Sequence, residues 1–305
     1  MTLPRNIHRI FKSNPVMEGA GVKLKRAFGF NDRPLFDPFL LLDDFRSSNP
    51  ADYRKGFPWH PHRGIETITY MLQGNVEHTD SLGNRGVITA GAVQWMTSGS
   101  GIIHQEMPYG DSQGVMGGFQ LWANLPASQK MNPPRYRDIT AMQIPKLHLE
   151  NGVEIHIISG SIGDTQGPVD DIAIDPEYLD ITVPSGISWT HRISNGHTAF
   201  AYIIAGKGLF SEDTDESFSS ENNGFSSFKK KRGEFLENET LILFSDGDSI
   251  TITTKEDPVR FLLISGKPLN EPIAWSGPIV MNTQTELHTA FEEYQNGTFL
   301  QHAVE

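Results

Sequence analysis

Residues 56–72 read GFPWHPHRGIETITYML, a stretch in which a proline-containing entry leads into a run of β-branched and apolar residues. The run at 65–72 predicts a strand, because β-branched and aromatic residues favour a pleated surface. Pro61 cannot donate a backbone hydrogen bond, which fits the entrance or the edge of a sheet. The side chains of His60 and His62 would leave the same face of an extended chain and could therefore converge on one ion.

Short runs of the same kind recur along the chain, and most are bounded by Gly, Pro, Asn, Asp or Ser. Many short strands at such spacing predict a sandwich or a barrel, and hence an all-β protein. The further runs lie at 86–89, 93–96, 119–123, 155–158, 179–183, 200–204, 240–244, 249–253 and 259–264.

The strand pattern occurs twice, over about residues 24–125 and 155–264. This repetition predicts a tandem of two similar domains. Pro133 and Pro134 end the first set, so we expect an N-terminal domain at 1–135 and a C-terminal domain at 136–305.

Two segments of the C-terminal half depart from the strand pattern. Residues 211–238 are poor in apolar side chains and carry both an acidic run and the basic run at 229–232, which predicts a mobile surface insertion. Residues 283–294 show helical periodicity, with one apolar face and one acidic face, which predicts a short C-terminal helix.

Bulk composition narrows the classes of function. Asp and Glu number 37 against 25 Lys and Arg, a net charge of −12, which argues against direct nucleic-acid binding. No apolar run approaches the roughly 18 residues that cross a membrane, and the N-terminus lacks the apolar core of a secretory signal. We expect a cytoplasmic monomer. The chain has no cysteine, so a metal site must use histidine, carboxylate or water.

A second pair of candidate ligands follows the first. His104 and Glu106 are again spaced i, i+2, and the residues between His62 and His104 suffice for about three strands with turns at Gly74 and at 83–84. A meander of that size would return the second pair beside the first. Three imidazoles and one carboxylate suit Fe(II), Mn(II), Ni(II) or Cu(II), and an octahedral ion would keep two positions open.

Glu66 is an alternative to Glu106. It shares the parity of His60 and His62, so it could be a ligand, an acceptor for an imidazole N–H, or a partner for Arg63. Spacing alone does not choose between the two glutamates.

Several ordered motifs resemble those of the pirin family. They are DPFLLLDDF at 37–45, HPHRGIET at 60–67, EHTDSLGN at 77–84, QWMTSGSGI at 94–102, HQE at 104–106 and QLW at 120–122. The resemblance implies a bicupin, in which two double-stranded β-helix (jelly-roll) barrels face one another and the N-terminal barrel holds the metal. It assigns the ligands to His60, His62, His104 and Glu106, and it places Glu66 just beyond them.

The second domain has no His-x-His, and its His191 and His197 stand apart in the sequence. We therefore expect the C-terminal domain to bind no metal.

The resemblance also implies an activity, cleavage of a flavonol-like substrate by dioxygen, of the quercetin 2,3-dioxygenase type. The expected cofactor is one Fe(II), with Mn, Ni, Cu or Zn as alternatives. Glu106 would be both ligand and proton acceptor, and Phe57, Trp95 and Gln120 would line the pocket for a small aromatic substrate. The alternative is a non-enzymatic, redox-sensitive iron protein that binds a transcription factor or a metabolic enzyme.

Overall fold

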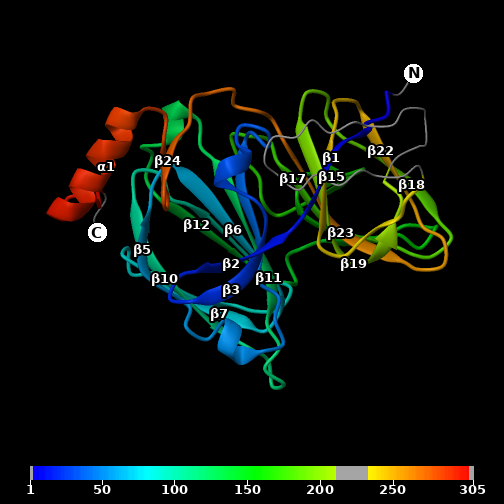
Figure 1. The fold of residues 1–305 in the computed structure, drawn as a ribbon, viewed down its shortest axis with the longest axis horizontal. Helices are drawn as coiled ribbons and strands as arrows, with labels where there is room; N and C mark the ends of the chain where they lie inside the picture. Colours follow the sequence, from blue (N-terminus) through cyan, green and yellow to red (C-terminus); the bar gives the residue numbers. More distant parts are fainter. Residues whose placement is uncertain (1–2, 211–232, 302–305) are drawn as a thin grey trace. The chain divides into compact units, whose positions relative to one another are not determined.

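A computed structural model of the chain describes residues 3–210 and 233–301. Its regular structure is almost entirely strand, from β1 to β25, with one α-helix, α1 (Gln284–Asn296), among the described residues (Figure 1). The predicted all-β class with a short C-terminal helix is therefore confirmed. No helix in the described ranges has the length and apolar character needed to span a membrane.

The strands form two compact units that exchange the ends of the chain. The first barrel comprises residues 14–143 and 269–305, and the second comprises 1–13 and 144–268. The sequence predicts one division at 135/136. In the structure the N-terminal residues before Asn14 belong to the second barrel and the C-terminal residues from Leu269 belong to the first. The physical reason at the N-terminus is strand pairing, since β1 (Ile7–Lys12) completes the edge of the second barrel's large sheet by pairing with β21 (Thr240–Phe244).

The first barrel is built from two antiparallel sheets. The larger has the order β12-β9-β6-β11-β4-β3-β2 and the smaller the order β5-β10-β7-β8. In chain order the strands are β2 (Asn14–Glu18), β3 (Val22–Phe28), β4 (Phe39–Asp44), β5 (Phe57–His62), β6 (Ile65–Gln73), β7 (Asn75–Asp80), β8 (Arg85–Ile88), β9 (Val93–Thr97), β10 (Ile102–Tyr109), β11 (Gly117–Asn124) and β12 (Arg135–Ile139).

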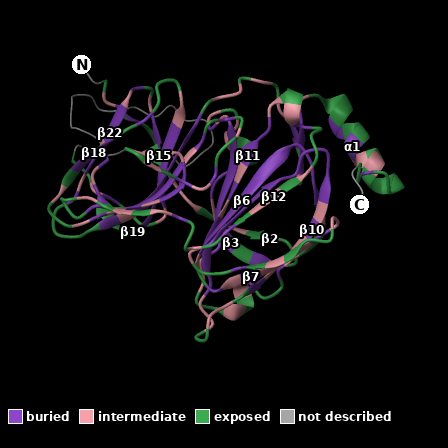
Figure 2. Ribbon diagram, turned by 180° about the vertical axis from the view of Figure 1, so that it is seen from behind, coloured by how far each residue is buried: buried purple, intermediate pink, exposed green. Residues whose placement is uncertain are grey.

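The central strand of the larger sheet, β6, is the run that opened the sequence argument. All seven of its residues from Ile65 to Met71 are buried, so both faces of the strand are covered (Figure 2). Between β5 and β6 the chain turns at Gly64, whose φ of +78° is unfavourable for residues with a Cβ. A Cβ at this position would also lie 1.9 Å from the carbonyl oxygen of Val280. The turn therefore separates the two strands into different sheets.

The second barrel has an analogous pair of layers. Its large sheet has the order β1-β21-β19-β23-β17-β14-β13, with β20 beside β19, and β18 pairs with β22. The strands are β13 (Lys146–His148), β14 (Glu154–Ser159), β15 (Ser161–Ile162), β16 (Thr165–Gln166), β17 (Glu177–Val183), β18 (Ser188–Arg192), β19 (Thr198–Gly208), β20 (Leu236–Glu237), β22 (Ser249–Thr253) and β23 (Val259–Gly266). Most of the predicted insertion at 211–238 lies outside the described residues, which resume at 233.

The C-terminal segment belongs to the first barrel. It adds the hairpin of β24 (Ala274–Ser276) and β25 (Ile279–Met281) and then α1. The helix begins with a capping box between Thr283 and Glu286 and ends at Gly297, which adopts a left-handed φ of +74°. Its apolar face packs on the hairpin through Leu287 and Ala290, so the helix needs the hairpin to bury that face.

Candidate metal centre

Three imidazoles meet at one point inside the first barrel. His60 and His62 project from β5, and the register of β10 places His104 directly opposite His60. The Nε2 atom of His60 lies 3.1 Å from that of His62 and 3.0 Å from that of His104. The potential ligand atoms of the three histidines all lie within 4.8 Å of one another. Three nitrogen donors at this spacing can hold one metal ion.

Backbone carbonyls orient two of the imidazoles. The Nδ1 atom of His60 lies 2.8 Å from the carbonyl oxygen of Pro58, and Nδ1 of His62 lies 3.1 Å from that of Pro278. An imidazole that donates from Nδ1 keeps the lone pair of Nε2 free for a metal. The start of β5 and the C-terminal hairpin therefore set the tautomers that metal binding needs.

The electrostatic environment favours the neutral form of two of the imidazoles, those of His62 and His104. Burial lowers the pKa of His62 and of His104 well below the ordinary histidine value, and the neighbouring imidazoles lower both further. A neutral imidazole is the form that binds a metal. His62 and His104 are therefore held in the form that a cation requires.

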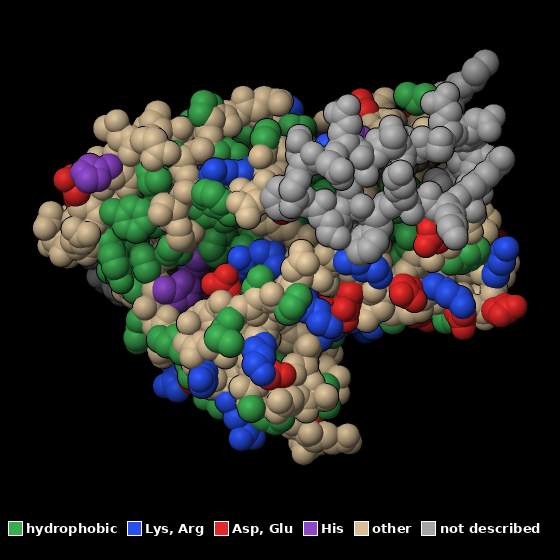
Figure 3. Space-filling model, in the orientation of Figure 1, with side chains coloured by type: hydrophobic (Ala, Val, Ile, Leu, Met, Phe, Trp, Pro, Cys, Tyr) green, Lys and Arg blue, Asp and Glu red, His purple; other side chains and the backbone are tan. Residues whose placement is uncertain are grey.

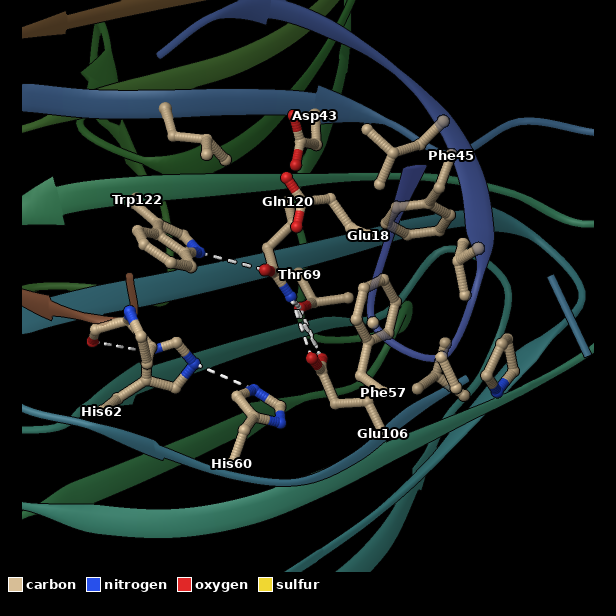
Figure 4. Close-up of a pocket in the computed structure, with 18 of the residues that line it drawn as sticks. Glu18, Asp43, Phe45, Phe57, His60, His62, Thr69, Glu106, Gln120 and Trp122 are labelled. Carbon is tan, nitrogen blue, oxygen red and sulfur yellow. Dashed lines mark hydrogen bonds between the residues drawn. The ribbon is translucent and has the colours of Figure 1, made fainter. Parts of the chain in front are cut away.

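Glu106 lines the same cavity but is turned toward a different partner. Each of its carboxylate oxygens accepts a hydrogen bond from Nε2 of Gln120 at 3.1 Å, and Oε1 also accepts one from the hydroxyl of Thr69 at 3.4 Å. The indole of Trp122 donates to Oε1 of Gln120 at 3.0 Å, which fixes the amide so that its NH2 group faces Glu106 (Figure 4). Glu106 is not among the three groups that converge.

Two of the histidines, His60 and His62, line a cavity of about 630 Å³. Its walls are mainly apolar and aromatic, and in Figure 3 histidine side chains are visible in a hollow among hydrophobic side chains. Phe57 and Gln120, two of the three residues expected to line a pocket, do so. A mainly apolar cavity with a few polar groups at one end is typical of small-molecule sites.

Trp95 and Glu66 lie elsewhere, which corrects two expectations. Glu66 pairs across the sheet with Thr97, and its carboxylate accepts a hydrogen bond from the Thr97 hydroxyl at 2.7 Å. Trp95 is two residues before Thr97 on β9 and so shares this face of the sheet, which is opposite to the face that carries Thr69. The parity argument failed because it was carried from His62 on β5 into β6 across the turn at 63–64.

Sequence reasoning missed a charged group in the cavity wall. Arg26 donates through Nε and Nη2 to the two carboxylate oxygens of Asp43, at 2.8 Å each, and Nη2 lies 2.9 Å from a carboxylate oxygen of Glu18. Burial raises the pKa of Asp43 to about 6, against the opposing effect of Arg26. Asp43 and Asp44 are two adjacent acids in the otherwise apolar run at 39–45, and acids within such a run were the available signal.

In the second barrel, the two histidines noted in the sequence have separate partners. His191 Nε2 lies 2.9 Å from a carboxylate oxygen of Glu177, and His197 Nε2 lies 3.8 Å from one of Asp175. These are two separate pairs of a histidine with a carboxylate.

Comparison with known proteins adds the family. The family model described as Pirin matches residues 21–123, and the one described as Pirin C-terminal cupin domain matches residues 178–300. A pirin-like protein of Caulobacter vibrioides is 40% identical over 97% of this chain and 99% of its own length.

Two further relatives carry the name of an enzyme. A protein of Pseudomonas aeruginosa named "Putative quercetin 2,3-dioxygenase" is 40% identical over 97% of this chain and 99% of its own length. The crystal structure of quercetin 2,3-dioxygenase from Acinetobacter baumannii superposes with a TM-score of 0.82 at 29% identity, covering 99% of this chain and all of that one. The matched segments fall in both barrels and the alignments run nearly end to end, so the chain belongs to the pirin family.

Proposed function

We propose that this protein is a metal-dependent dioxygenase of the quercetin 2,3-dioxygenase type, with the metal held by His60, His62, His104 and Glu106. The observation that carries the proposal is the convergence of three imidazoles beside a mainly apolar cavity, which His60 and His62 line. The names of the relatives from Pseudomonas aeruginosa and Acinetobacter baumannii point to the same activity.

The donor set fits a divalent ion. Nitrogen ligands with a carboxylate suit Fe(II), which we propose as the metal, and also Mn(II), Ni(II) and Cu(II). A bound ion of this kind would supply Lewis acidity toward a substrate hydroxyl and the redox chemistry that dioxygen requires. Three nitrogens and one carboxylate would leave two positions of an octahedral ion open for substrate and dioxygen.

Glu106 would provide the proton acceptor. Its carboxylate lies in the cavity beside the histidines, and rotation away from Gln120 would bring it toward the metal and a substrate hydroxyl. Gln120 would position Glu106 through its hydrogen bonds to the carboxylate. After Glu106 has released the proton that it accepted, its carboxylate would return to these hydrogen bonds. Trp122 would keep the Gln120 amide in the orientation that allows this, because an inverted amide would present its oxygen to the carboxylate.

The substrate would be a flat aromatic molecule. The aromatic rings of Phe57 and Trp122 line the cavity, and stacking against them adds to the burial of apolar surface. The apolar walls would also exclude water from the reacting groups.

The test is turnover by iron-loaded protein. We expect consumption of quercetin and dioxygen with release of carbon monoxide, measured by absorbance, an oxygen electrode and gas analysis. Glu106→Gln keeps the shape of the side chain but removes the proton acceptor, so its kcat should fall by about 10²-fold or more. His191→Ala in the second barrel is the matched control and should leave turnover unchanged. Full metal binding without any flavonol loss would reject the enzyme and favour the regulatory alternative.

A further inference from the structure

A row of polar side chains crosses the inner face of the larger sheet of the first barrel. The strand registers pair Arg26 with Asp43, Asp43 with Gln120, and Gln120 with Thr69. Directly opposed residues in a sheet share a face, and all four line the cavity. The row thus joins Thr69 and Gln120, the partners of Glu106, to the Arg26–Asp43 pair. Asp43 lies two strands from Thr69, which at ordinary strand spacing is about 10 Å.

Asp43 is at the far end of the cavity from the imidazoles. Figure 4 shows Asp43 beyond Gln120 on one side, with His60 and His62 on the other. A ligand that touches the histidines at one end could therefore reach Asp43 with its other end.

The charges at this far end do not balance. Arg26 is shared between Asp43 and Glu18, so one guanidinium faces two carboxylates. The side chain of Asp43 is only 8% exposed, whereas that of Glu18 is 42% exposed. A carboxylate can accept about four hydrogen bonds, and Arg26 supplies one to each oxygen of Asp43. The buried wall therefore offers unused acceptor capacity.

The surroundings limit what can use that capacity. Leu24, Leu41 and Phe45 line the same part of the cavity wall as the charged group. They favour an uncharged aromatic ring, and the excess negative charge disfavours a carboxylate or sulfate on that ring. A phenolic hydroxyl combines an apolar ring with a donor and satisfies both conditions.

We propose that Asp43, held by Arg26, is a specificity-determining residue that accepts a hydrogen bond from a phenolic hydroxyl on the substrate ring remote from the metal. The inference rests on the proposed function for the placement of the substrate's other end at the histidines. It narrows the substrate class to neutral hydroxylated aromatics. Anionic aromatics would be rejected because they would bring a second uncompensated charge into a buried wall.

The experiment measures binding without turnover. Metal-loaded protein under anaerobic conditions is titrated with quercetin and with 3-hydroxyflavone. Quenching of the fluorescence of the three tryptophans that line the cavity, Trp59, Trp122 and Trp275, gives each Kd. The second ligand keeps the hydroxyl proposed to meet the metal but lacks the remote ones. Wild type should bind quercetin about tenfold more tightly, because a hydrogen bond to a charged acceptor is worth roughly 1.5 kcal/mol or more.

Asp43→Asn should reduce that preference to about threefold or less while leaving the Kd of 3-hydroxyflavone unchanged. Asp44→Asn is the matched control. Asp44 is the next residue of β4, points to the opposite face and pairs with Arg46, so its substitution should not alter the preference. If Asp43→Asn does not fold, Glu18→Gln provides a milder change that should shift the preference in the same direction.

Several outcomes would overturn the subsite. They are an undiminished preference for quercetin in Asp43→Asn, an equal weakening of both ligands, or no binding of either flavonol. The turnover assay tests the proposed dioxygenase activity independently of this binding experiment. A preference that depends on Asp43 in a protein that never turns quercetin over would retain the subsite and reject the dioxygenase.

Discussion

The Nδ1 atom of His62 lies 3.1 Å from the carbonyl oxygen of Pro278, although the two residues are 216 positions apart in the sequence. The C-terminal hairpin thus supplies the acceptor that orients a candidate metal ligand near the start of the chain. The acceptor is a backbone oxygen of the hairpin, so the orientation of the His62 imidazole depends on how firmly the hairpin is held in place.

Arg63 is one residue that holds the C-terminal segment. Its side chain is 2% exposed, donates to the carbonyl oxygen of Phe299 at 2.8 Å and lies 2.6 Å from a carboxylate oxygen of Glu293. We expect Arg63→Met to lower the free energy of unfolding by about 3 kcal/mol, because it leaves buried acceptors unpaired. Metal affinity should fall about tenfold, because His62 loses its fixed acceptor. Urea denaturation and chelator competition measure the two effects.

Glu293→Gln is the control for that variant. The Glu293 side chain is 26% exposed, and Gln keeps an acceptor for Arg63. The free energy of unfolding should therefore fall by well under half of the decrease expected for Arg63→Met. Equal effects of the two substitutions would show that the charge of the pair, and not the anchoring of the segment, matters.

Metal removal should destabilise the first barrel. A ligand that binds only the folded state raises its stability by RT ln(1 + [L]/Kd), which is about 2.7 kcal/mol at a metal concentration of 100 Kd. We expect the melting temperature to rise when metal is restored to the stripped protein, and His104→Ala to abolish that rise. His191→Ala should keep it, since His191 pairs with Glu177 in the second barrel. Elemental analysis should give one metal per chain. Two metals per chain would contradict the prediction for the C-terminal domain.

Acidification should destabilise the metal-free protein because His62 and His104 are held neutral in the folded state. The pKa of His62 and of His104 is lowered in the folded state, so below the ordinary value of about 6.5 the unfolded chain binds protons that the folded chain does not. The free energy of unfolding therefore falls as the pH decreases through this value, by at most about 1.4 kcal/mol per pH unit for each group. His62→Leu should have a shallower slope than wild type between pH 6.5 and 5.5 in urea titrations. An identical slope would mean that His62 is not held neutral.

Local sequence patterns predicted the elements and the imidazole cluster well. The runs at 65–72 and 240–244 became β6 and β21, and the periodicity at 283–294 became α1, because burial and strand or helix preference agree there. The His-x-His and the following His104 met as expected, since β5 and β10 are neighbours and the i, i+2 rule holds within a strand.

Side-chain orientations beyond a turn and contacts between distant segments could not be predicted from the local sequence. The parity of Glu66 could not be carried from β5 into β6, because Gly64 resets the direction of the chain. The pairing of Arg26 with Asp43 depends on the register of β3 against β4, which short-range patterns do not specify. The carbonyl of Pro278 has no side-chain signal at all, and nothing local could have placed it beside His62.

Lys130 is a second residue that holds the C-terminal segment, and its three hydrogen bonds within the described part of the chain go to uncharged oxygens. Its Nζ donates to the carbonyl oxygens of Gly64 and Val280, at 2.8 and 3.0 Å, and to Oδ1 of Asn124 at 2.6 Å. The residue is 1% exposed, and burial lowers the pKa of its amine to about 7. These three bonds join the turn between β5 and β6 to the hairpin strand β25.

We expect Lys130→Met to lower the free energy of unfolding by about 3 kcal/mol, because an apolar side chain of similar length removes the buried Nζ donor from Val280 and Asn124 and leaves the Gly64 carbonyl oxygen with only its bond from the Leu125 N–H. Lys23→Met is the control. The Lys23 side chain is 62% exposed and forms a surface salt bridge with Asp52, so its loss should change stability by less than about 0.5 kcal/mol. Urea denaturation measures both variants. If the Lys130 amine merely fills space, Met would replace it at little cost and the two variants would be alike. A large loss restricted to Lys130→Met, accompanied by weaker metal binding, would show that donors at this turn hold β5 and its two histidines in place.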